Sequence, residues 1–189
     1  MLFRSGSEMY KQFVVIILVI LSVNTANAEL YLEVAAEAGG NELISTNSVD
    51  SIEAGGGIKF AVGVQNPVNY DGSAAIRLSV GYLSDSIFAD NGQANFSTMT
   101  FDAMLVSSSG PHSFGVGVTL HLSPEYSDNV AGYYPELIEY DDALGLVFQY
   151  SYHFVPGLEI GLRYTDITYE TSGFSDDAGS LGIFLSSGF

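Results

Sequence analysis

The chain ends in the sequence SLGIFLSSGF, residues 180–189. Leu181, Ile183, Leu185 and Phe189 fall on one side of an extended chain, and the residues between them are mostly Ser and Gly. A period of two residues is typical of a β-strand with one apolar face, whereas a helix would repeat its apolar residues every three or four positions. The stretch therefore predicts a strand, and the rest of the chain has to supply its neighbours.

The same alternation recurs in seven earlier segments. The connections after the second, fourth and sixth segments are short, while the others are long and polar. Up-and-down barrels alternate short turns with long loops in this way. The pattern predicts an all-β fold, an eight-stranded antiparallel transmembrane β-barrel that occupies residues 29–189 as one domain. The seven expected strands are residues 29–38, 52–64, 74–83, 96–107, 114–123, 143–154 and 158–168.

Residues 1–28 have the three parts of a secretory signal peptide. Arg4 and Lys11 precede an apolar run, and Ala26-Asn27-Ala28 forms a small-x-small cleavage site. The run is shorter than the roughly 20 apolar residues that an anchoring helix needs. We expect cleavage after Ala28 and export. Because the chain has no cysteine, packing or a membrane has to stabilise the exported protein.

The two faces of the predicted strands differ in kind. One face is a continuous series of Leu, Ile, Val, Phe and Tyr, and the other is rich in Gly, Ala, Ser and Thr. A soluble barrel of the lipocalin kind would place bulky apolar residues in its lumen and charges outside. An eight-stranded membrane barrel needs the opposite arrangement, because its interior is only just wide enough for side chains. The sequence predicts that the apolar face meets lipid.

The small-residue face also carries the charges. Buried charges need partners of opposite sign, and a basic residue facing mid-membrane lipid costs roughly 2–4 kcal/mol. We therefore expect an interior ion-pair network, with the alternative that Glu37 and Glu159, near strand ends, are solvated at the rim. Its predicted members are Glu33, Glu53, Lys59, Arg77, Asp102, Glu159 and Arg163.

The segment Gly161-Leu162-Arg163-Tyr164-Thr165-Asp166-Ile167 and the terminal strand resemble the small bacterial outer-membrane β-barrel family of the OmpA and OmpX type. The resemblance implies a Gram-negative outer membrane as the location, with lipid and lipopolysaccharide around a monomer. It also implies insertion by the barrel-assembly machinery. The assembly signal would be Leu181, Ile183, Leu185 and Phe189.

His121 and Ser123 have the His-x-Ser spacing of outer-membrane lipid A deacylases, which this chain resembles in size. The spacing places both residues on the inward face of a strand, away from a lipid substrate. Asp166-Ile167-Thr168 stands where such enzymes carry their motif, and it has no His. We expect no catalysis, cofactor or transition-metal site.

The charge balance limits the partners. Five Lys and Arg stand against 22 Asp and Glu, so the chain should repel nucleic acid. Acidic loops could hold divalent cations, although a solvated acidic loop is the simpler interpretation. The residues concerned are Glu136, Glu139, Asp141 and Asp142.

Shared architecture does not determine activity. We expect a structural or cell-surface interaction role. The alternative is a narrow pore or passive transport of small or apolar solutes, as in OmpW-like barrels. A lumen filled by the ion pairs would distinguish the two.

Overall fold

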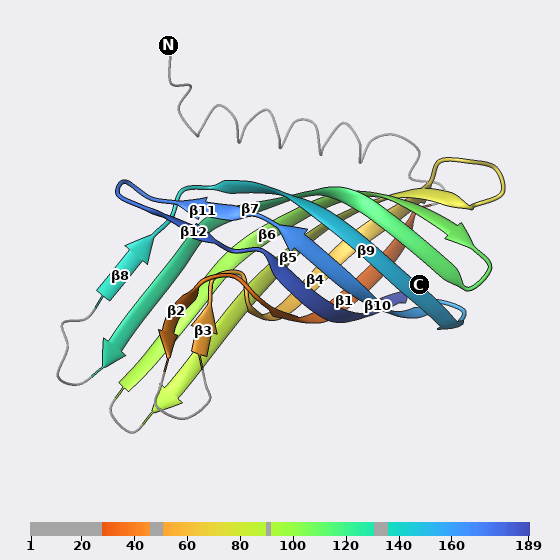
Figure 1. Ribbon diagram of the computed structural model, residues 1–189. Helices are drawn as coiled ribbons and strands as arrows, with labels where there is room; N and C mark the ends of the chain where they lie inside the picture. The colour runs from red at the N-terminus through yellow and green to blue at the C-terminus, as the bar shows by residue number, and fades with distance from the viewer. Residues whose placement is uncertain (1–27, 46–50, 90–91, 131–135) are drawn as a thin grey trace, which may run out of the picture.

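The computed structural model describes residues 28–45, 51–89, 92–130 and 136–189, and within them every regular element is a strand (Figure 1). The predicted signal peptide, apart from Ala28, lies outside these residues. No helix in the described part of the chain is long and apolar enough to cross a membrane. The strands are β1 (Glu29–Ala38), β2 (Glu42–Ser45), β3 (Ser51–Glu53), β4 (Gly57–Pro67), β5 (Ala74–Ala89), β6 (Gly92–Ser109), β7 (His112–Val130), β8 (Glu136–Glu139), β9 (Ala143–Val155), β10 (Leu158–Asp166), β11 (Thr168–Glu170), β12 (Ser175–Asp177) and β13 (Ser180–Gly188).

Eight of these strands form a closed antiparallel barrel, as the sequence predicted. The order around the wall is β6-β5-β4-β1-β13-β10-β9-β7, and pairing of β6 with β7 closes it. The first and last strands pair along their length, from Tyr31 opposite Gly188 to Ala38 opposite Leu181. At the end of this pair Leu30 donates its N–H to the Phe189 carbonyl at 3.2 Å, and Phe189 donates to Leu30 at 2.9 Å. The closing strand therefore has no free edge.

Side chains alternate between the lumen and the outer surface along each wall strand. In β1, Glu33 is buried while its neighbours Leu32 and Val34 are exposed. The outer surface is apolar, and aromatic rings such as Phe114, Tyr152 and Tyr164 lie near strand ends. This arrangement is the one that a transmembrane barrel needs.

The predicted strand over residues 52–64 is wrong at its beginning. Ser51–Glu53 is β3, which pairs with β2 in a separate hairpin, and the wall strand β4 starts only at Gly57. The chain turns between them, with φ values of +80° at Gly55 and +123° at Gly57. Glycine adopts such values without steric cost. Alternation could not reveal this turn because Ile52 remains buried, although in a different core.

The four predicted long loops are also wrong, because each contains strand: β2 follows the first wall strand, β11 and β12 follow β10, and the other two extend the wall strands. β5 continues to Ala89, β6 begins at Gly92, and β7 continues to Val130 and pairs with β8. We call the paired residues 85–89, 92–97, 125–130 and 136–139 the protruding sheet. Figure 1 shows these strands continuing past the end of the barrel.

A bulge separates the two parts of β7. Ser123 has a φ of +47°, and the β6–β7 register shifts between Ser97 and Met99. An extra residue in one strand increases its local twist and exchanges the faces of the residues that follow. Tyr126 is therefore buried above the lumen.

Candidate functional site

The lumen holds three buried ion pairs. The first joins Lys59 Nζ on β4 to Asp102 Oδ2 on β6 at 2.7 Å, and both side chains are 4% exposed. Asp102 Oδ1 also accepts a hydrogen bond from the Thr119 hydroxyl at 2.7 Å, and Ser79 donates to Oδ2 at 3.2 Å. A buried carboxylate with several donors is well satisfied. Together these contacts link four consecutive wall strands, β4, β5, β6 and β7.

The second pair joins Arg163 on β10 to Glu33 on β1. Both guanidinium nitrogens Nη1 and Nη2 reach the carboxylate, at 2.5 and 2.9 Å, and Nη2 also donates to Gln149 at 2.9 Å. Such two-point contact fixes orientation as well as charge. The guanidinium lies over the Phe184 ring, 5.3 Å from its centre, so the ring face also attracts the cation.

The third pair joins Arg77 on β5 to Glu159 on β10, closer to the short-turn end. Glu159 Oε2 accepts from Ser151 at 2.7 Å, and His153 Nε2 lies 3.3 Å from the same oxygen. Arg77 also stacks 5.4 Å from the centre of the Tyr31 ring. Glu159 is 3% exposed, so the alternative of a solvated rim position does not describe it.

Glycines make room for the aromatic rings in the lumen. A Cβ on Gly63 would lie 2.6 Å from the Tyr31 ring, and one on Gly161 would lie 2.4 Å from Phe184. Large and small inward residues therefore interdigitate, as expected for a barrel of this size. The ion pairs and these rings together occupy the lumen.

Glu53 is placed apart from the other six predicted members of the network. It lies on β3, where its Oε2 accepts the backbone N–H of Gly39 at 2.6 Å. Among the described residues it forms no ion pair. Its position follows from the turn at Gly55, which the alternation of the sequence did not reveal.

A second core closes the long-loop end of the barrel. It is apolar and is built from the protruding sheet, the β2–β3 hairpin and the β11–β12 hairpin. We call it the cap core, and it holds Ile52, Ala54, Leu83, Ala94, Phe96, Tyr126, Tyr140, Ala143, Ile167, Tyr169 and Ala178.

Tyr169 lies at the centre of the cap core and is fully buried. Its ring lies 5.8 Å from Phe96 and 5.6 Å from Tyr140 between centroids. Its hydroxyl lies 2.6 Å from His121 Nδ1, which ties the cap core to wall strand β7. Burial raises the pKa of the Tyr169 hydroxyl, so it stays protonated.

Polar contacts join the hairpins of the cap core to one another. The Tyr140 hydroxyl donates to Asp176 at 2.8 Å, and the Asn41 side-chain amide donates to the same carboxylate at 3.1 Å. The backbone of Asn41 also donates to the Asp177 carbonyl at 2.6 Å. Segments far apart in sequence are thus held as one unit above the lumen.

Solved structures of the same architecture identify the fold. The attachment invasion locus protein Ail of Yersinia pestis, solved with the heparin analogue sucrose octasulfate, matches with a TM-score of 0.54 and 10% identity, over 86% of this chain and 97% of that one. Neisserial surface protein A (NspA) matches with a TM-score of 0.51 and 15% identity over the same shares. The protein has the fold of the eight-stranded outer-membrane β-barrels. No protein-family model and no curated protein sequence matches it.

In an outer-membrane barrel the long loops face the cell exterior. By this rule we expect the cap core and the protruding sheet on the extracellular side. Two strands bound the protruding sheet: β8 is terminal in the sheet order, and β5 has its partner β4 only as far as Ser84. Within the described residues, the outer edges of β8 and of β5 from Asp85 onward have no sheet partner. Such edges can pair with another strand.

The long-loop end of the barrel has exposed Asp and Glu side chains but, beyond the predicted signal peptide, no exposed Lys or Arg. Outside the predicted signal peptide the chain has three basic residues, Lys59, Arg77 and Arg163, and all lie in the lumen. Glu125 and Glu139 face each other across β7 and β8, and both are exposed. Like charges opposite each other on a sheet are destabilising.

The other predicted loop acids do not converge. Asp142 accepts the backbone N–H of Ser123 at 2.9 Å, and the side chain of Glu136 lies outside the described set. Among the described residues no group of three or more His, Asp or Glu side chains is arranged to hold a metal ion. On the protruding sheet, partial burial raises the pKa of Asp85, and the nearby Glu53 carboxylate raises it further.

The expected placement of His121 and Ser123 on one inward face is wrong. His121 is buried and bonded to Tyr169, whereas Ser123 is exposed. The bulge at Ser123 turns its side chain to the other face. The predicted assembly-signal residues Leu181, Ile183, Leu185 and Phe189 all lie on the lipid-facing side of the closing strand or at its end.

Proposed function

We propose that this outer-membrane barrel has a structural and surface-interacting role, without catalysis, and that its extracellular end binds a cationic partner. The observation that carries the proposal is the distribution of charge. The basic residues beyond the signal peptide are paired inside the lumen, which leaves Glu125 and Glu139 facing each other on an exposed sheet. A cationic partner would relieve that repulsion.

The protruding sheet supplies the contact surface in this proposal. Its edge strands β5 and β8 can hydrogen-bond to an extended segment of a partner, and nearby carboxylates would select for positive charge. The Yersinia neighbour is named for attachment and was solved with a sulfated heparin analogue. An acidic surface repels sulfate groups, so we expect this barrel to prefer ligands of the opposite charge.

Binding of a lysine-rich peptide to barrels in phospholipid vesicles tests the proposal. We expect binding that weakens steeply with salt, since exposed charges are screened over about 10 Å at 0.1 M ionic strength. Replacing Glu125 and Glu139 together by Gln should weaken it further. Replacing the exposed Glu29 at the periplasmic end by Gln is the matched control. Equal affinity in the wild type and the double variant would contradict the proposal.

The second candidate function, a narrow pore, is tested by conductance in planar bilayers. The filled lumen favours no current from the wild type. The double variant Arg163→Ala with Glu33→Ala removes a whole ion pair and serves as a widened control. Discrete current steps from the folded wild type would favour transport instead.

We further propose that the barrel-assembly machinery recognises β13 as its insertion signal. Two observations support this role. The outward side chains of β13 and Phe189 are exposed on the barrel surface, and the backbone of β13 closes the barrel by pairing with β1. Deleting Phe189 should slow insertion and leave protease-sensitive precursor in the periplasm. Normal insertion of the shortened chain would contradict this role.

A further inference from the structure

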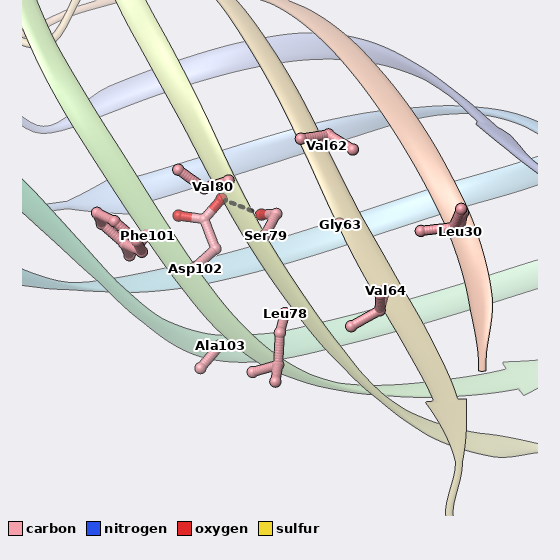
Figure 2. A pocket seen from close by; sticks show the side chains of 10 residues that line it. All are labelled: Leu30, Val62, Gly63, Val64, Leu78, Ser79, Val80, Phe101, Asp102 and Ala103. Atoms are coloured by element: carbon pink, nitrogen blue, oxygen red, sulfur yellow. Dashed lines mark hydrogen bonds between the residues drawn. The ribbon is translucent and has the colours of Figure 1, made fainter. Parts of the chain in front are cut away.

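The outer wall of the barrel carries an apolar groove over β1, β4, β5 and β6, with a volume of about 250 Å³. Cross-strand register explains its shape. Leu30, Val64, Leu78 and Ala103 stand side by side on the four strands and form one bank. Val62, Val80 and Phe101 form the other bank. The strand positions between the banks are Gly63, Ser79 and Asp102 (Figure 2).

The groove exists because the outward side chains are short here. Val62, Val64, Val80 and Ala103 stand where the wall around β9 and β10 has larger residues, such as Phe148 and Tyr164. Leu78 faces outward by register, yet it is only 8% exposed because it is sunk between its neighbours. The wall is therefore hollowed on one side of the barrel and bulky on the other.

The position of the groove identifies its surroundings. Leu30 is the second residue of β1, and Val64 and Leu78 flank the periplasmic turn between β4 and β5. The groove is continuous with the lipid-facing surface and lies in its periplasmic half. The medium on that surface is hydrocarbon, in which apolar surface incurs no cost of exposure.

We propose that this groove holds one acyl chain of a phospholipid from the periplasmic leaflet of the outer membrane. The two banks fit a flexible chain of methylenes, and the groove offers no exposed cation for a headgroup, so recognition is through shape. Close packing gains dispersion contacts that a loosely covered groove would lose. The proposal is independent of the function proposed for the extracellular end.

The bound chain would also affect the lumen. The backbone of Asp102 lies between the two banks of the groove. Its carboxylate is on the lumen side of the wall, where it pairs with Lys59. Figure 2 shows the hydrogen bond that the Ser79 hydroxyl donates to the Asp102 carboxylate. Hydrocarbon packed against this part of the wall keeps water away from the backbone that carries the ion pair.

Native mass spectrometry of the barrel purified from membranes in mild detergent tests the proposal. We expect the wild type to retain one phospholipid. Ala103→Phe fills the groove and should lower that retention several-fold, whereas Leu162→Phe, on the opposite wall, is the matched control and should not. Resistance of each variant to unfolding by detergent confirms that it is folded.

A second measurement uses the absence of tryptophan from the chain. Phe101→Trp places a single fluorophore on the groove bank, and Phe148→Trp places one on the other wall. In vesicles with a minor share of lipids brominated on the acyl chain, quenching should be stronger at position 101, and Ala103→Phe should abolish the difference. Equal quenching at both positions would overturn the proposal, as would a two-barrel mass without lipid, which would assign the groove to a second copy.

Discussion

The lumen and the cap core solve the same problem of filling a barrel in opposite ways. In the lumen, three ion pairs and small residues fill the space, and each charged group reaches across to another wall strand. In the cap core, apolar and aromatic side chains from separate hairpins pack around Tyr169. The wall strands are already held together by their backbone hydrogen bonds, so the lumen can hold buried charges. The hairpins of the cap core lack that continuous sheet, and apolar contacts hold them together.

This contrast has an energetic basis. A buried ion pair is stable only while both partners are present, because desolvation of each charge nearly cancels the attraction. An apolar core loses stability in proportion to the apolar volume that a substitution removes. Damage to the lumen should therefore affect the whole barrel, and damage to the cap core should remain local.

The largest effect is expected from Arg163→Ala. It leaves Glu33 buried without a cation, which should lower the free energy of unfolding by about 3–5 kcal/mol. Urea unfolding in lipid vesicles measures it. Adding Glu33→Ala removes the orphaned charge and should restore much of the loss. Equal losses in the single and double variants would show that the charge itself is unimportant.

Phe96→Ala should have the next largest effect and confine it to the cap core. Phe96 is fully buried against Tyr169, and such a truncation costs about 3 kcal/mol. Limited proteolysis should cut the extracellular hairpins faster, while the barrel keeps its resistance to detergent. A simultaneous loss of that resistance would mean that the cap core and the lumen fold as one unit.

Tyr169→Phe tests the link between the two regions. It removes the hydrogen bond to His121 but keeps the ring, so the expected cost is about 1 kcal/mol. Amide hydrogen exchange should accelerate in β11 and β12 and stay unchanged in β1 and β13. Unchanged exchange in β11 and β12 would show that ring packing alone holds the hairpin.

The smallest effect concerns pH and Asp85. Its pKa is raised in the folded protein, so its contribution to stability is fully present below its unfolded pKa and is lost as the pH rises through the folded pKa. Asp85→Asn should therefore slow proteolysis of the protruding sheet at neutral pH. The advantage over wild type should fade as the pH falls toward about 4. A constant advantage at every pH would point to a cause other than charge.

Most of the wall was predictable from sequence because an extended chain exposes alternate residues to two different media. Leu32, for example, is apolar and faces outward, whereas its neighbour Glu33 is charged and faces the lumen. The cap core was not predictable in the same way. Ile52 and Phe96 continue the alternation of their strands, so nothing local indicates that they leave the lumen or rise above the membrane.

The sequence by itself determined the barrel, the number of wall strands, the lipid-facing side and the inward position of every basic residue beyond the signal peptide. Those features depend on period and residue type, which are local. The tertiary structure alone decided which charges pair, that Glu53 stands apart, that the bulge at Ser123 separates it from His121, and that the loops continue the sheet. These depend on register, turns and curvature, which bring together residues as far apart as Glu33 and Arg163.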